Sequence, residues 1–115
     1  MDDKMGVTLQ DEIIADLTAE LGKDPGFSED VLKSKVVSAI REVKLKRNYG
    51  ATSYTAKQIE SDLYSYYSVI KKVALYDYNQ IGAEGEKSHN ENGISRTWED
   101  RDKLFADVTA FVKVL

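Results

Sequence analysis

The residue types that could perform chemistry gather in residues 76–96, YDYNQIGAEGEKSHNENGISR. Its glycines frame a GAEG segment, but their spacing is not that of a phosphate-binding loop, and Glu84 and Glu86 would repel a phosphate. His89 is not part of a recognisable motif with a Ser or Cys nucleophile. We therefore interpret His89 as a solvated loop histidine and predict no catalytic residue in this stretch.

Pairs of acidic residues are the other candidates for chemistry. Asp11 with Glu12, and Glu99 with Asp100, each fall in the first turn of an expected helix, where the helix dipole favours acids. No pair of a general acid and a general base emerges. The chain has no cysteine and a single histidine, so a metal site would need carboxylates or a second chain. We expect no metal, no cofactor and no enzymatic activity.

The elements that position these residues belong to a chain of 115 residues, 42% hydrophobic and 31% charged. This composition indicates one soluble globular domain, 1–115. No apolar run approaches the roughly 18 residues of a membrane helix, and the acidic N-terminus lacks a signal core, so we expect a cytoplasmic chain. One proline and seven glycines favour helices over short strands. The expected fold class is all-α, with about four helices, a long third helix and a long polar loop before the last.

Two helices are predicted in the first part of the chain. Thr8 can cap the first helix, whose apolar stripe runs from Leu9 to Leu21 and which Gly22 ends. Ser28 can cap the second helix. Its buried side is expected to carry Leu32, Val36, Ala39, Ile40 and Val43.

Basic residues crowd toward the C-terminal half of the second helix. They are Lys33, Lys35, Arg41, Lys44, Lys46 and Arg47. A solvated face that complements the helix dipole explains them, and contact with DNA phosphates or an acidic partner is the alternative. The formal net charge of −4 argues against the broad basic surface of a nucleic-acid-binding protein.

The third helix is predicted to begin after Thr55, with Gln58 completing a capping box, and to end at Gly82. It would run roughly 26 residues, or about 39 Å. Outside its main apolar stripe lie Tyr64, Leu75, Tyr76 and Tyr78. These residues predict a second contact face, and tyrosines that lie along the surface with hydroxyls in water are the alternative.

A polar loop, residues 83–95, is expected to lead into a last helix that Ser95 or Thr97 caps and that extends to Leu115. Asp77 falls within the apolar stripe of the third helix, and Arg101 within that of the last. If the two helices are antiparallel neighbours, these two residues lie level. A buried carboxylate needs a cation, so we predict that Asp77 pairs with Arg101, with Arg96 as the other candidate.

Residues 53–105, and above all the YDYNQIGAEGE…HNENGISR core, resemble the small head-tail connector proteins of tailed bacteriophages and their prophages. The resemblance implies a helical structural protein of the virion's head-tail junction that assembles in the host bacterial cytoplasm. Its copies would form a ring, commonly of about a dozen, under the portal protein. Such a ring extends the DNA channel, through which DNA passes without sequence-specific binding, and docks stopper or tail proteins.

The resemblance gives the second contact face and the polar loop a role at subunit or partner interfaces. The residues expected there are Tyr64, Leu75, Tyr76, Tyr78, Gly82, Glu84, Glu86, His89 and Asn92. The alternative function is a small helical nucleic-acid-binding or regulatory protein that uses the basic second helix. That alternative predicts binding to DNA that weakens steeply with salt.

Overall fold

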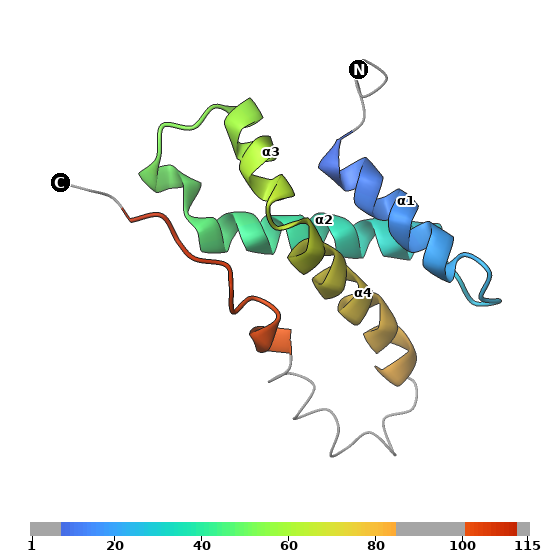
Figure 1. The fold of residues 1–115 in the computed structure, drawn as a ribbon. Coiled ribbons are helices and arrows are strands. Elements are labelled where there is room, and N and C mark those ends of the chain that lie inside the picture. The colour runs from blue at the N-terminus through green and yellow to red at the C-terminus, as the bar shows by residue number, and fades with distance from the viewer. Residues whose placement is uncertain (1–7, 85–100, 113–115) are drawn as a thin grey trace.

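The computed structural model describes residues 8–84 and 101–112, and all regular secondary structure in these two ranges is helical (Figure 1). The elements are α1 (Leu9–Leu21), α2 (Glu29–Arg47), the 3₁₀ turn η2 (Tyr49–Ala51), α3 (Ala56–Tyr64) and α4 (Tyr67–Glu84). A short helical turn, 101–103, follows. The predicted all-α fold class is confirmed.

The predicted helix starts are confirmed by their hydrogen bonds. The Thr8 hydroxyl accepts a hydrogen bond from the Asp11 backbone, and the Asp11 carboxylate accepts one from the Thr8 backbone. Ser28 caps α2 through its side chain. Thr55 and Gln58 form the same reciprocal box at the start of α3. These caps satisfy backbone N–H groups that the first turn of a helix leaves without partners.

The expected single long third helix is wrong, because the chain breaks it into α3 and α4. At Ser65 and Tyr66 the backbone N–H groups donate to carbonyls three residues back, which tightens the chain there. The junction contains no proline or glycine. Contacts from elsewhere hold it instead, since Arg47 binds Asp62 just before the break and lies 4.9 Å from the Tyr66 ring just after it.

The expected helix end at Gly82 is also wrong, since α4 continues to Glu84. A lone glycine costs a helix only about 1 kcal/mol relative to alanine, which does not suffice to end it. The start of the expected polar loop, at residues 83 and 84, is therefore helical. The rest of that loop, 85–95, lies outside the described residues.

The predicted last helix is largely wrong. Its proposed caps, Ser95 and Thr97, lie outside the described residues; helix is present at 101–103, turns follow to residue 107, and 108–112 have no regular secondary structure. This last part contains β-branched residues, which disfavour helix. Its backbone finds a partner on α2 instead, because the Phe111 N–H donates to the Arg47 carbonyl at 2.8 Å.

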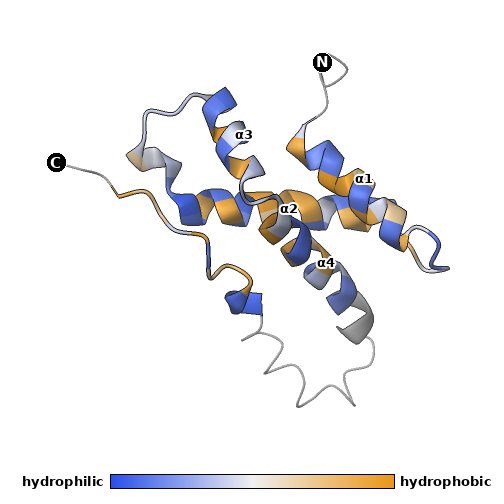
Figure 2. Cartoon of the chain, in the orientation of Figure 1, coloured by the Kyte–Doolittle hydropathy of each residue, from blue (hydrophilic) through white to orange (hydrophobic). Residues whose placement is uncertain are grey.

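The hydrophobic core lies where α1, α2 and α4 meet. α4 crosses α2, and α1 packs against both of them (Figure 1). Figure 2 shows hydrophobic and hydrophilic residues on each helix, as expected of helices with one buried side. The buried apolar residues are Leu9, Ile13, Ile14, Leu17, Leu32, Val36, Ala39, Val43, Leu63, Ile70, Val73, Ala74 and Phe105. Ile40, which the sequence placed on the buried side of α2, is half-buried at the edge of this core.

Candidate functional site

Arg101 forms an ion cluster with Asp77 of α4 and Glu42 of α2, which we call the Arg101 cluster. Its Nε and Nη2 atoms each lie 2.7 Å from an oxygen of Asp77. Its Nη1 atom lies 3.2 Å from Glu42, and Nη2 also donates to Glu42. The pair that the sequence predicted is present. Arg96, the other candidate, lies outside the described residues.

The Arg101 cluster is shielded from water, because only 14% of the Arg101 side chain and 17% of the Asp77 side chain are exposed. Hydrogen bonds to Asp77, and then to Glu42, raise the pKa of Arg101 above its ordinary value. Sequence reasoning missed Glu42. Glu42 lies beside the buried positions Ala39 and Val43, which suggests that it needs a positively charged partner. The local sequence does not indicate which residue that partner is. The cluster joins α2 and α4 to the segment that begins at Arg101.

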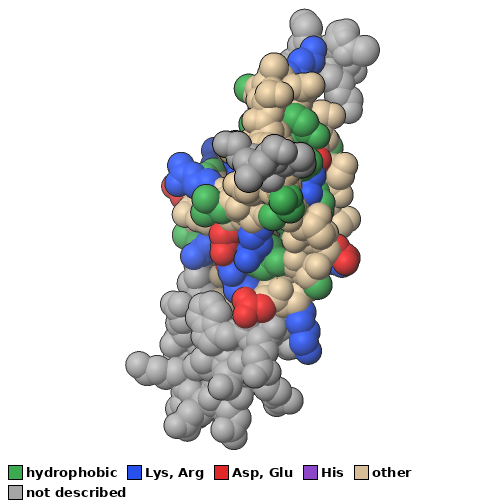
Figure 3. Space-filling view, turned by 90° about the vertical axis from the view of Figure 1, so that its left-hand side faces the viewer, with side chains coloured by type: hydrophobic (Ala, Val, Ile, Leu, Met, Phe, Trp, Pro, Cys, Tyr) green, Lys and Arg blue, Asp and Glu red, His purple; other side chains and the backbone are tan. Residues whose placement is uncertain are grey.

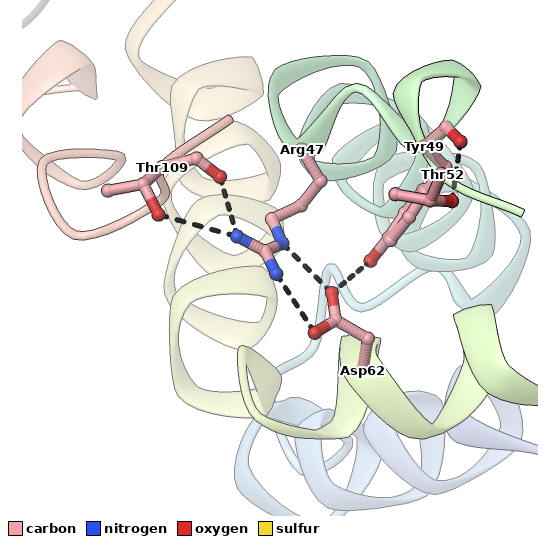
Figure 4. A network of polar contacts seen from close by, with 5 residues as sticks. All are labelled: Arg47, Tyr49, Thr52, Asp62 and Thr109. Carbon is pink, nitrogen blue, oxygen red and sulfur yellow. Dashed lines mark hydrogen bonds and ion pairs between the residues drawn. The ribbon is translucent and has the colours of Figure 1, made fainter. Parts of the chain in front are cut away.

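A second cluster surrounds Arg47 at the C-terminal end of α2, and we call it the Arg47 cluster (Figure 4). Arg47 donates from Nε and Nη2 to the two oxygens of Asp62, at 2.9 and 3.0 Å. The Tyr49 hydroxyl donates to the same carboxylate at 2.5 Å. Arg47 also donates from Nη1 to the Thr109 carbonyl at 2.6 Å. This guanidinium therefore binds α3 and the C-terminal segment at once.

The Arg47 cluster overturns the placement of Arg47 on a solvated basic face. The residue is only 8% exposed, and its guanidinium carbon lies 4.0 Å from the centre of the Phe111 ring. Burial raises the pKa of Asp62, but hydrogen bonds from Arg47 and Tyr49 outweigh burial and hold that pKa below its ordinary value. Burial, and then the bond to Asp62, raise the pKa of Tyr49. The polar groups of this cluster are hydrogen-bonded to one another, so the cluster attaches α3 and the C-terminal segment to the end of α2.

The other basic residues of α2 fit the predicted solvated face better. Lys33, Arg41, Lys44 and Lys46 are exposed, whereas Lys35 is half-buried. The Lys46 ammonium lies 4.7 Å from the centre of the buried Phe105 ring. The basic surface available to an anionic partner thus lacks Arg47.

A row of polar contacts joins α1 to α3 and α4, and the sequence did not indicate it. Tyr64 donates to Glu12 at 2.6 Å, and Tyr67 donates to Asp16. The Lys71 ammonium lies 2.7 Å from a Glu20 oxygen. Glu12, Asp16 and Glu20 are four residues apart on α1, so they share one face of that helix. The spacing of these three acids could have indicated a polar face on α1, although it does not identify the residues that contact it.

Two of the residues predicted to meet other subunits pack inside the chain. The Tyr78 hydroxyl accepts a hydrogen bond from the Ser28 backbone at 3.0 Å, and its ring lies 6.0 Å from that of Phe27. Leu75 is half-buried against the core. The second face that the sequence assigned to the long helix is therefore partly covered by the chain itself.

The remaining predicted interface residues lie in mixed settings. Tyr64 is 37% exposed, and Tyr76 is half-buried. Gly82 and Glu84 belong to α4. The structure does not describe the other predicted interface residues, Glu86, His89 and Asn92.

Among the described side chains, none are grouped in threes or more as His, Asp or Glu ligands for a metal ion. None of the helices in residues 8–84 and 101–112 is long and apolar enough to cross a membrane. Comparison with models of protein families, with curated proteins and with solved structures finds no match to this chain.

Proposed function

We propose that this chain is a structural protein of the virion, a protomer of a phage head-tail connector. Its copies form a ring under the portal protein, extend the DNA channel, and dock stopper or tail proteins at the head-tail junction. The proposal rests on the resemblance carried by residues 53–105. These residues contribute α3, α4 and the first turn after Arg101 to the fold.

The observation that carries the proposal is the position of the Arg101 cluster. Asp77 is the second residue of the distinctive part of the resembling stretch and Arg101 follows that part, and the cluster holds these two residues together on α2. The described ends of that stretch are thus anchored at one place on the helical core. A rigid base of this kind suits contact with another protein, as a connector requires.

The paired charges that are shielded from water favour a structural role in the same way. Arg47 and Asp62 bind each other, and Arg101 binds Asp77, so these ions connect helices and segments. A catalytic acid or base needs a free proton site that a substrate can reach. The excess of acidic over basic residues also suits a channel through which DNA slides, because phosphates are not attracted to it.

The test is the solution mass by light scattering over a wide range of concentrations, with and without a matching portal ring. We expect large closed species, either alone or only on the portal. A chain that stays monomeric at every concentration and does not bind the portal contradicts the proposal. If that monomer binds DNA and loses it steeply as salt rises, the alternative function through the exposed lysines of α2 replaces it.

Tyr64 offers a matched pair of variants for the same assay. Tyr64→Phe removes only the hydroxyl that bonds Glu12 within the chain, whereas Tyr64→Ala removes the exposed ring as well. If the ring packs on a neighbour, Tyr64→Ala weakens assembly and Tyr64→Phe assembles as the parent chain does. Equal assembly of all three chains excludes Tyr64 from the subunit interface.

A further inference from the structure

The C-terminal arm, residues 101–112, attaches to a helical body, residues 8–84, that has a core of its own. Of the buried apolar residues in the described chain, Phe105 alone comes from the arm. The others belong to α1, α2, α3 and α4. The body therefore keeps nearly all of its buried apolar contacts when its own arm is replaced by another.

The body holds the arm through a cradle formed by Arg47, Asn48, Tyr49 and Tyr54. The Asn48 side chain donates to the Phe111 carbonyl at 3.1 Å, and the Arg47 carbonyl accepts from the Phe111 N–H at 2.8 Å. The Phe111 ring lies 5.9 Å from the Tyr49 ring and 5.3 Å from the Tyr54 ring. The cradle thus binds both the backbone and the aromatic side chain of Phe111.

The arm contacts the body at two separate places. Arg101 enters the cluster with Asp77 and Glu42, and Thr109 and Phe111 enter the cradle. A peptide that fills both places must carry an arginine, a backbone carbonyl and an aromatic ring at the spacing of Arg101, Thr109 and Phe111. The arm of a second copy of this chain meets that requirement.

We propose that arms are exchanged in the assembled ring, so that the cradle of each protomer binds the arm of its neighbour. This inference rests on the proposed ring assembly. Every contact between arm and body is the same within one chain and between two chains, so exchange loses none of them. Residues 85–100 join the arm to the body and can span at most about 55 Å, which sets the limit on how far apart exchanging protomers lie.

Exchange of this kind also gives the assembly a direction. Each protomer donates one arm and receives one arm through different surfaces, which is a head-to-tail contact, and such contacts form a ring when the rotation from one protomer to the next closes. In a dilute solution the chain's own arm has the advantage of a high effective concentration. On a portal, the arm of a neighbouring protomer would also be held at a high effective concentration near the cradle. The arm lies on the side of the molecule that Figure 3 faces, where hydrophobic side chains occur among charged ones.

The test uses the unmodified chain, prepared with ordinary nitrogen and with ¹⁵N, and assembled in equal amounts on the portal. An amine-reactive cross-linker is chosen to join Lys46 of the body to Lys103 of the arm; Lys46 lies against Phe105, and Lys103 is exposed. We expect cross-linked peptides that carry one label of each kind to be as abundant as those with matching labels. A ring that yields only matching labels overturns arm exchange and leaves the connector function standing. A chain that forms no ring overturns both.

A charge-reversal experiment tests the same exchange without a cross-linker. Asp77→Arg and Arg101→Asp each break the pair within one chain, but an exchanged mixture matches Arg101 of one chain with Asp77 of the other. We expect the mixture to assemble better than either variant alone. The double variant D77R/R101D controls for tolerance of the reversed pair. If the double variant assembles and the mixture does not, the arms stay on their own bodies.

Discussion

Arg101 contacts Asp77 through two hydrogen bonds of 2.7 Å across 24 residues of chain, and it is also bonded to Glu42. The Arg101 cluster is therefore a junction of α2, α4 and the C-terminal arm. Because both side chains are mostly shielded from water, removal of one partner leaves the other charge poorly compensated. The stability of the fold should respond accordingly.

Asp77→Ala should lower the free energy of unfolding by about 2 kcal/mol, less than a fully isolated buried charge would cost, because Glu42 still binds Arg101. Urea unfolding measures the change. The double variant D77L/R101M removes both charges, and we expect it to be closer to the parent chain than Asp77→Ala is. A double variant that is less stable than the sum of the two single changes would contradict this account of the pair.

Arg47→Ala should be more damaging, with a loss of about 3 kcal/mol, because it leaves the mostly shielded Asp62 carboxylate without its cation and removes the bond to Thr109. Arg47→Lys keeps the charge but loses the fork that binds Asp62 and Thr109 together, and about 2 kcal/mol should be lost. Arg41 is an exposed arginine on the same helix and provides the matched control. Its change to alanine should stay within about 0.5 kcal/mol. Similar losses for Arg41→Ala and Arg47→Ala would show that the cluster has no special role.

The depressed pKa of Asp62 predicts a loss of stability in acid. Since the folded pKa lies below the unfolded value of 3.8, the contribution is fully present above that value and disappears as the pH falls through the folded pKa. Urea unfolding measured from neutral pH downward should show part of this loss. In Asp62→Asn that part of the acid dependence should be absent, although the variant is less stable at neutral pH. An identical pH dependence in both chains would contradict the assignment.

Asn48 has a positive φ of 61° at the end of α2, and its side chain binds the Phe111 carbonyl. Asn48→Ala should cost about 1–2 kcal/mol from the backbone conformation, since alanine resists a left-handed geometry. It should lose about 1 kcal/mol more from the missing hydrogen bond. Asn48→Gly accepts the backbone and loses only the bond, so thermal unfolding should rank it between the parent chain and Asn48→Ala. The reverse order of the two variants would contradict the argument.

The hydrogen bond to Glu12, and then partial burial, raise the pKa of Tyr64 to about 12. The absorbance difference between the parent chain and Tyr64→Phe isolates this hydroxyl during a titration with base. Glu12→Gln should move the transition toward the ordinary value of 10.0, because an amide does not repel the tyrosinate as a carboxylate does. A transition that Glu12→Gln leaves unchanged would show that this contact is absent in solution.

Much of the helical structure could be predicted from local sequence, because its causes are local. A hydroxyl that caps a helix contacts a backbone group three residues away, so Thr8, Ser28 and Thr55 could be identified without a structure. The buried apolar residues of α1 and α2 follow from helical periodicity in the same way. Asp77 and Arg101 could be paired because each is a charge within an apolar stripe, which requires a partner of opposite sign.

The break between α3 and α4, the irregular end of the arm and the burial of Arg47 were decided by tertiary structure. Periodicity continues across Ser65 and Tyr66, and no local breaker marks that site. A guanidinium from α2 binds Asp62 on one side of the break and contacts Tyr66 on the other, so distant contacts lie at the site where the helix stops. The sequence by itself determined where α1, α2 and α3 begin and which of their faces are apolar, because those properties depend on neighbours three or four residues apart. Only the folded chain decided which distant groups form hydrogen bonds with Arg47. Each such group exchanges hydrogen bonds with water for one with the guanidinium, and the fold as a whole decides which groups come within reach.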